Sequence, residues 1–370
     1  FMFSEHDDPV LTYLNDDGTM VEPEYYVPII PFALVNGISG IGTGFSCNIA
    51  PYNPQQIINY LKDKIDNKNL DDYDFIPYYE GFKGTVQRIE DNKYLIKGCY
   101  EKIADDKIRI TELPIGTWTM PYTAYLDSLV DGIVDNKTGK KGTPYLKDVS
   151  SVCTEVSIDI TVVFPKGKMK DYEENKDSNG CNGIEKLLKL FTTVSTTNMH
   201  MFDKDCKLHK YNNVNEIINA FYDVRLELYR KRKAFQLNQL RQKLIRLSNR
   251  AKYIQENLDG TVDLRRKKHD EVNRILESKE YDKIDGDFKY LIKMPMDSVT
   301  EENAKHIMDE EENTKQEIVK LEKMKEETIW KNELTKLQDE YKKYKVTRIK
   351  IQSETQKIEK KSKGKKIVKK

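Results

Sequence analysis

Hydrophobic residues recur with a helical period along the second half of the chain. From Asn213, an N-cap candidate followed three residues later by Glu216, apolar residues return at alternating steps of three and four. The spacing settles into heptads, and Gly260 ends the pattern. Residues 300–344 repeat these steps after a module without periodicity. Two helices that return antiparallel predict a coiled-coil stalk, with residues 261–299 as a globule at its far end.

The first half follows a different pattern, with short apolar runs separated by glycine and proline. Strands are predicted at Tyr25–Ile30, Gly84–Ile89, Tyr94–Ile96, Lys107–Leu113 and along Tyr145–Pro165. Helices are predicted at Pro54–Ile65, Ile184–Phe191 and Leu264–Leu276. The polar stretch 166–183 is expected to be a mobile surface loop. The chain is therefore predicted to be an α+β protein.

Charge limits how much of this chain can be buried. The 370 residues hold 62 Lys and Arg against 61 Asp and Glu, and 33% are charged and 38% hydrophobic, against about 25% and 45–50% in globular domains. Only part of the chain can build a core. No run approaches the roughly 18 apolar residues of a membrane span, so no membrane partner is expected. Five scattered cysteines without CxxC spacing argue against a disulfide scaffold or a zinc site and indicate a reducing compartment.

One segment is dense in glycine and carries a single apolar residue. Gly37, Gly40, Gly42 and Gly44 fall within eight positions and predict a loop whose backbone can approach another molecule closely. Ile41 has no neighbour within this loop that could bury it. Such a residue is either a plug that packs in a core or a wedge that unstacks and kinks a DNA duplex from the minor groove. The residues by themselves favour the plug.

Several segments, in order along the chain, resemble one enzyme family. They are EPEYYVPIIPFALVNGISGIGTGFS (22–46), GFKGTV (81–86), ITELPIGTWT (110–119), NMHMFD (198–203), KYNNVNEI (210–217) and YRKRK (229–233). Over nearly its whole length the chain resembles the type IIA DNA topoisomerases of eukaryotes and large DNA viruses. The resemblance implies the C-terminal half of the DNA breakage-reunion core, part of an ATP-dependent enzyme that passes one duplex through a transient double-strand break.

The resemblance also implies a domain order and DNA-contacting residues. The domains would be the end of a winged-helix domain (1–30), a tower domain (31–212), a first coiled-coil helix (213–260), a dimerisation globule of the exit gate (261–299), a returning helix (300–344) and a basic tail (345–370). Ile41 matches the isoleucine that intercalates and bends the gate duplex, flanked by Gly40, Gly42 and Thr43, which reverses the preference for a plug. Trp118 matches a tryptophan near DNA, with a core position beside Tyr122 as the alternative.

The catalytic chemistry of this family is expected outside the chain. Its nucleophile, a tyrosine preceded by arginine, aligns about ten residues before Phe1, so no catalytic residue is expected here, and the chain is interpreted as a fragment or a processed piece. The complete enzyme would need Mg²⁺ and ATP, while this chain is expected to bind neither and to be inactive alone. The implied partners are double-stranded DNA, a second copy through the coiled-coil gate, and the upstream catalytic and ATPase portions. The implied location is the nucleus, or the host cytoplasm or viral factory for a large DNA virus.

The remaining charged groups have plainer interpretations. Asp7 and Asp8 are expected to cap or solvate a turn. The basic face from Arg225 to Lys252 meets the transported DNA or is a solvated flank. The lysine-rich end, which should not fold alone, is a nuclear-localisation signal, a loose nucleic-acid contact or a solubilising tail. Two rival functions stay open: a structural coiled-coil protein that tethers DNA, and a split-gene topoisomerase subunit.

Overall fold

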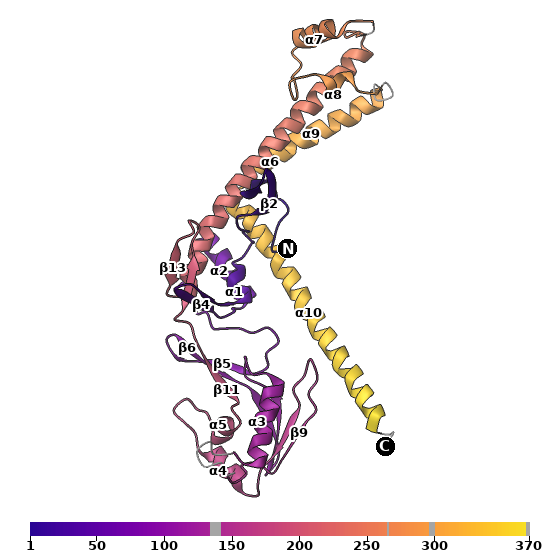
Figure 1. Ribbon diagram of the computed structural model, residues 1–370. Helices are drawn as coiled ribbons and strands as arrows, with labels where there is room; N and C mark the ends of the chain where they lie inside the picture. Colours follow the sequence, from indigo (N-terminus) through magenta and orange to yellow (C-terminus); the bar gives the residue numbers. More distant parts are fainter. Residues whose placement is uncertain (134–141, 265, 296–299, 368–370) are drawn as a thin grey trace. The chain divides into compact units, whose positions relative to one another are not determined.

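A computed structural model describes residues 1–133, 142–264, 266–295 and 300–367, with side chains described up to residue 353 (Figure 1). The chain divides into two compact units. Unit 1 consists of Phe1–Met2, Ile30–Tyr222 and Leu334–Lys370, and unit 2 of Phe3–Ile29 and Asp223–Glu333. Both units contain helices and strands, which confirms the predicted mixture. No helix among the described residues is long and apolar enough to cross a membrane.

Unit 1 is built on antiparallel strands. They are β3 (Ile38–Gly42), β4 (Phe45–Ile49), β5 (Thr85–Glu90), β6 (Lys93–Lys97), β7 (Cys99–Ala104), β8 (Lys107–Glu112), β9 (Asp148–Ser151), β10 (Ile160–Val163), β11 (Phe191–Ser195), β12 (Met199–Phe202) and β13 (Leu208–Tyr211). One sheet has the order β7-β8-β10-β9 and another the order β11-β6-β5, while β3 with β4 and β12 with β13 form two-stranded hairpins. Strands β5, β6 and β8 confirm three of the predicted runs.

Unit 1 also contains helices. They are α1 (Phe32–Asn36), α2 (Pro54–Ile65), α3 (Thr119–Asp131), α4 (Lys168–Glu174) and α5 (Gly183–Leu187). Helix α2 has the predicted bounds, and the Asn53 side chain caps it by accepting the Gln55 N–H at 2.9 Å. Leu126 and Leu129 of α3 pack on Ile110 and Ile160 of the four-stranded sheet, so that this sheet has an apolar core on the side of α3.

Three predictions for unit 1 were wrong in part. The run 145–165 is two paired strands, β9 and β10, joined by residues 152–159, in which Val152 and Val156 are exposed. The stretch 166–183 is not merely a loop, because it contains α4, whose Met169 is completely buried. The predicted helix 184–191 ends at Leu187, and β11 begins at Phe191.

Unit 2 is dominated by long helices. Its elements are a 3₁₀ turn (Asp8–Val10), β1 (Tyr13–Asp16), β2 (Thr19–Pro23), α7 (His269–Ser278), α8 (Lys289–Ile292) and α9 (Glu301–Lys323), with parts of α6 (Val214–Leu258) and α10 (Glu326–Ile367). Helix α6 begins at the predicted cap, where Glu216 N–H donates to Asn213 Oδ1 at 2.9 Å. It ends just before Gly260, whose φ of +70° lies in the left-handed region.

Helices α6 and α9 run antiparallel, side by side (Figure 1). Arg241 pairs with Glu322 at 2.7 Å and Lys243 with Glu310 at 2.8 Å. The residue numbers increase along α6 while those of their partners decrease along α9, which is the pattern of an antiparallel pair. Apolar residues at heptad spacing on α6 are buried between the two helices. The cluster consists of Leu247, Ala251, Ile254, Ala304 and Ile307. The helical pattern therefore identified the face of α6 that packs against α9.

The returning helix differs from its prediction. It is broken: α9 ends at Lys323, Met324 is extended, and α10 begins at Glu326. The ammonium of Lys233 on α6 donates to the Met324 carbonyl at 2.7 Å. It thereby gives a hydrogen-bond donor to a carbonyl at the C-terminal end of α9 that has no partner within the helix. Helix α10 also passes position 344 without interruption and continues to Ile367, into the segment expected to be an unfolded tail.

Residues Tyr25–Ile30 do not form the predicted strand. Pro28 has no N–H to donate to a neighbouring strand, and two carbonyl groups of the segment bond to side chains. The Val27 carbonyl accepts from Arg225 at 2.6 Å, and the Ile29 carbonyl accepts from the buried indole of Trp330 at 2.9 Å. The segment is therefore fastened to helices. The predicted helix 264–276 also begins later, at His269.

Candidate nucleic-acid interface

The glycine-dense segment is a hairpin, not the predicted loop. Strands β3 and β4 pair from Ile38 with Ile49 to Gly42 with Phe45, and Thr43 and Gly44 make the turn. Gly44 has a φ of +84°, which a turn this tight requires and glycine adopts freely. Ile41 lies one residue before the last pair, and its side chain is 93% exposed. The hairpin therefore presents one large apolar side chain, next to its tip.

Two of the glycines are needed because other atoms lie where a side chain would be. A Cβ on Gly37 would lie 3.0 Å from the Ile49 carbonyl oxygen, and its φ of +72° already favours glycine. A Cβ on Gly42 would lie 2.7 Å from the ring of Phe45. At Gly40 nothing comes within 4 Å, so that position is open to another molecule. The sequence thus combines a packed hairpin base with an open tip.

A second hairpin, β12–β13, supports the first. The Asn48 N–H donates to the Asn198 carbonyl at 2.8 Å, and the Asn198 amide donates to Ser46 Oγ at 2.8 Å. Nearer the tip, the rings of Phe45 and Phe202 meet edge to face, with centroids 5.7 Å apart. Since Phe45 also covers Gly42, the tip is held through contacts with β12 rather than by the turn residues alone.

Ile41 is not a plug in the core of this chain, because its side chain is almost completely in water. A single exposed isoleucine contributes little to folding, and it carries no charge or hydrogen-bonding group. An apolar side chain on a supported hairpin has the shape and chemistry of a residue that inserts between stacked bases. Thr43 and Gly40, on either side of it, are exposed as well.

Trp118 is also exposed, by 79%, and so is not the core tryptophan of the alternative interpretation. It is the residue before the first turn of α3, and neighbouring Met120 is 83% exposed. Tyr122 occupies the core instead, and its hydroxyl donates to the Leu188 carbonyl at 2.7 Å. Among the described residues, no hydrogen bond or ring contact joins Trp118 to the hairpin of Ile41. Ile41 and Trp118 are thus two exposed apolar side chains of unit 1 that do not contact each other.

The described residues contain no grouping suited to hold Mg²⁺, since no three His, Cys, Asp or Glu side chains gather at metal-binding distances. Buried tyrosines are poor candidates for a nucleophile. Burial raises the pKa of Tyr122 and Tyr229 far above the usual value, and that of Tyr290 to about 12. What unit 1 exposes near its hairpin and at the start of α3 is the apolar side chains of Ile41 and Trp118.

A buried ionic cluster in unit 2 corrects the interpretation of Asp7. This residue is 4% exposed, and its carboxylate pairs with Arg225 at 2.8 Å and Arg232 at 3.4 Å. Arg232 also pairs with Glu333 at 2.7 Å. No local pattern could reveal this cluster, because Asp7 and Arg225 lie 218 positions apart. Arg225 and Arg232 therefore belong to the interior of unit 2, not to a basic surface facing DNA.

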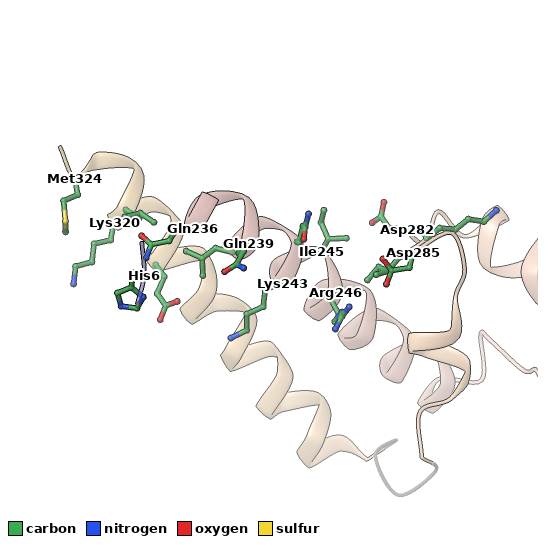
Figure 2. Close-up of a pocket in the computed structure, with 16 residues that line it drawn as sticks. His6, Gln236, Gln239, Lys243, Ile245, Arg246, Asp282, Asp285, Lys320 and Met324 are labelled. Atoms are coloured by element: carbon green, nitrogen blue, oxygen red, sulfur yellow. The ribbon is translucent and has the colours of Figure 1, made fainter. Parts of the chain in front are cut away.

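Two residues of the predicted basic face, Lys243 and Arg246, line an open groove of about 1040 Å³ in unit 2, bounded by α6, α9 and residues 282–285 (Figure 2). Lys243, Arg246 and Lys320 line it together with Asp282 and Asp285. The groove is lined by side chains of both signs, a mixture that does not suit a chain of phosphates. This favours the interpretation of the face as a solvated flank of the helix pair.

Comparison with known proteins places this geometry in a family. Residues 1–366 match the sequence profile that describes the A subunit of DNA gyrase/topoisomerase IV. The chain belongs to that family. It is 31% identical to DNA topoisomerase 2 of Penicillium chrysogenum, over 90% of this chain and 22% of that protein. It is 30% identical to DNA topoisomerase 2 of Acanthamoeba polyphaga mimivirus, over 92% of this chain and 31% of that protein.

A solved structure extends the comparison to three dimensions. The chain matches the crystal structure of the Plasmodium falciparum topoisomerase II DNA-binding, cleavage and re-ligation domain with a TM-score of 0.78 and 30% identity, over 92% of this chain and 48% of that one. The chain spans between about a fifth and a third of the two topoisomerase 2 relatives. The family resemblance predicted from the motifs is confirmed, and the mixed fold agrees with this core of a type II topoisomerase.

Proposed function

We propose that this chain is the C-terminal half of the DNA breakage-reunion core of a homodimeric, ATP-dependent type II topoisomerase. In that enzyme one duplex, the gate segment, is cut, and a second duplex passes through the break. The part played by this chain is to bend the gate segment and to form the exit through which the second duplex leaves. The nucleophilic tyrosine, the Mg²⁺ site and the ATPase belong to portions upstream.

The exposure of Ile41 on a supported hairpin carries this proposal. The side chain is 93% exposed, and the Phe45–Phe202 contact holds the tip that bears it. Unstacking one base step costs a few kcal/mol, and a rigid apolar wedge offsets this cost when it fills the opened step. A mobile loop would have to be ordered first, at an additional cost in conformational entropy. Gly40, Thr43 and the exposed Trp118 would contact the bent duplex next to the wedge.

The helix pair α6 and α9 supports the gate role. Its ion pairs and buried heptad residues are those of an antiparallel coiled coil, and α7 and α8 make a small apolar globule. A second copy meeting this globule would close a ring beneath the gate segment. Relatives from a mimivirus and from eukaryotes agree with action in a nucleus or a viral factory. The family membership favours this function over a structural protein that only tethers DNA.

The test is Ile41→Ala in the complete enzyme, with the bend of a duplex measured by energy transfer between dyes at its ends. Because Ile41 buries little in the free protein, the melting temperature should stay within a degree or two of wild type, while the bend angle falls. Ile103→Ala on β7 is the matched control: this isoleucine is also exposed, at 52%, but lies outside the hairpin, so both measurements should remain as in wild type.

The opposite result would contradict the wedge. A loss of roughly 2–5 kcal/mol of stability with normal bending would mean that Ile41 is a core residue of the assembled enzyme. The split-gene alternative is tested separately, by sequencing upstream of Phe1 in the gene. An Arg-Tyr pair in the same reading frame supports one polypeptide, and a stop codon there supports two.

A further inference from the structure

The turns at the tips of the hairpins β3–β4 and β12–β13 lie side by side. Strand β12 runs antiparallel to β4, because Asn198 contacts Ser46 and Asn48 while Phe202, further along β12, contacts Phe45. Phe45 starts β4 at the turn that follows Ile41, and Phe202 ends β12 at its own turn. The two turns therefore point in the same direction, with the Phe45–Phe202 contact between them.

The second turn, residues 203–207, is held in one conformation by hydrogen bonds between its own residues. The Asp203 carboxylate accepts the N–H groups of Asp205 and Lys207, each at 2.9 Å, and the Asp203 N–H donates to the Lys207 carbonyl at 2.9 Å. Cys206 takes the left-handed conformation that closes the turn, with a φ of +58°. The charge of Asp203 is thus engaged inside the turn, and the side chains of the other turn residues extend outward.

Positive charge gathers on and beside this turn. Lys204, Lys207 and Lys210 are exposed, and none of them lies within ion-pair distance of a carboxylate in the described part of the chain, although the charge of Lys207 acts on Asp203. Asp205 is the acidic side chain left on the outside. Phosphate groups of a duplex are the ligand class that unpaired lysines beside an apolar wedge suit best, because a kink at Ile41 brings the flanking backbone toward the neighbouring tip.

We propose that the turn 203–207 is a second DNA contact, in which Lys204 and Lys207 bind the phosphates that flank the base step opened by Ile41. This inference rests on the proposed function, since it takes DNA as the ligand and Ile41 as the wedge. The Phe45–Phe202 contact fixes the spacing between wedge and lysines. One hairpin opens the base step, and the other holds the backbone beside it.

The test measures the affinity of the 370-residue chain for a duplex as a function of salt concentration. Each phosphate contact on B-form DNA contributes about 0.9 to the slope of log K against log salt. Replacing both lysines, Lys204→Gln and Lys207→Gln, should make this slope shallower by about 2 and weaken binding most at low salt. Lys305→Gln with Lys320→Gln on α9 removes the same charge from unit 2 and should leave the slope unchanged.

Asp205→Asn gives a second measurement with the opposite sign. If the turn faces phosphates, removing this carboxylate should tighten binding at low salt, whereas a loss of folding could only weaken it. A slope and affinity that match the α9 control in both turn variants would overturn the proposal. Unchanged binding by Asp205→Asn alone would overturn it as well, because an exposed carboxylate on a turn that faces DNA repels the phosphates at low salt, so its removal must raise the affinity.

Failure of this inference can be told from failure of the proposed function. If wild type bends DNA and Ile41→Ala does not, while the lysine variant keeps the wild-type slope, only the second contact is refuted. If wild type neither binds nor bends the duplex, the proposed function itself fails, and the inference with it.

Discussion

Replacing Asp7 by alanine should destabilise unit 2 severely, although Asp7 lies in an irregular segment near the start of the chain. The carboxylate is 4% exposed and bonds to Arg225, which is completely buried, and to Arg232. The Nε atoms of both arginines and Nη2 of Arg225 already lack hydrogen-bond partners. The other carboxylate of the cluster, Glu333, lies 3.8 Å from Nη2 of Arg225 and already binds Arg232, so it can replace the lost carboxylate only in part.

The magnitude follows from what the substitution leaves behind. Removing one partner of a buried ion pair typically costs about 3–5 kcal/mol, because the remaining charge stays out of water without compensation. For a unit of this size the melting temperature should fall by roughly 10 °C. Thermal and urea unfolding followed by circular dichroism would measure both quantities. Binding of Glu333 to Arg232 at 2.7 Å should limit the loss to the lower part of that range.

The neighbouring residue is the control. Asp8 is exposed, and its side chain forms no hydrogen bond or ion pair among those described, so Asp8→Ala should change stability by no more than about 0.5 kcal/mol. If Asp7→Ala were as mild as Asp8→Ala, the buried cluster would not be a source of stability. The account of how residues 3–29 are fastened to α6 would then be refuted.

Three further predictions concern assembly, chemistry and pH. Sedimentation equilibrium at micromolar concentration should show a dimer of the 370-residue chain, and a monomer alone would count against the gate. The chain mixed with supercoiled plasmid, ATP and Mg²⁺ should not relax it; relaxation that survives stringent fractionation would mean that a nucleophile lies within the chain. Hydrogen bonds, first from the Lys207 N–H, lower the pKa of Asp203, so its stabilisation is present above about pH 4 and is lost as pH falls through the lowered value. Asp203→Asn should flatten the acid-side decline of melting temperature, and an unchanged decline would show that the turn contributes no stability.

Sequence patterns predicted the elements whose determining residues all lie within a few positions of one another. Helix α2 has the predicted bounds because an Asn cap, Pro54 at its first turn and an apolar face over Ile57, Ile58 and Leu61 all lie within the segment itself. The start of α6 was predicted for the same reason, since Asn213 and its partner are three residues apart. The proposal that Ile41 is a wedge depends on the resemblance to the family motif, because glycine density by itself suggested a loop.

The predictions that were wrong or absent concern contacts between segments that are far apart in the sequence. At the break after Lys323, the Met324 carbonyl accepts from Lys233, a residue on another helix that no local pattern connects to it. Helix α4 was hidden in a polar stretch because only two of its side chains, Met169 and Tyr172, face the core, at a spacing of three. The support that Phe202 gives to the hairpin of Ile41 could not be predicted either, since Phe202 lies 157 positions from Phe45 and only the fold brings the two rings together.

The most direct test of the central claim is a photo-cross-link from position 41. A photoreactive benzoylphenylalanine replaces Ile41 in the complete enzyme, the protein is bound to a duplex, and the cross-linked atoms are identified after irradiation. The account predicts cross-links to nucleobases at one base step, and none from the same residue at position 103. Cross-links from position 41 only to protein, with the duplex bound, would contradict the wedge.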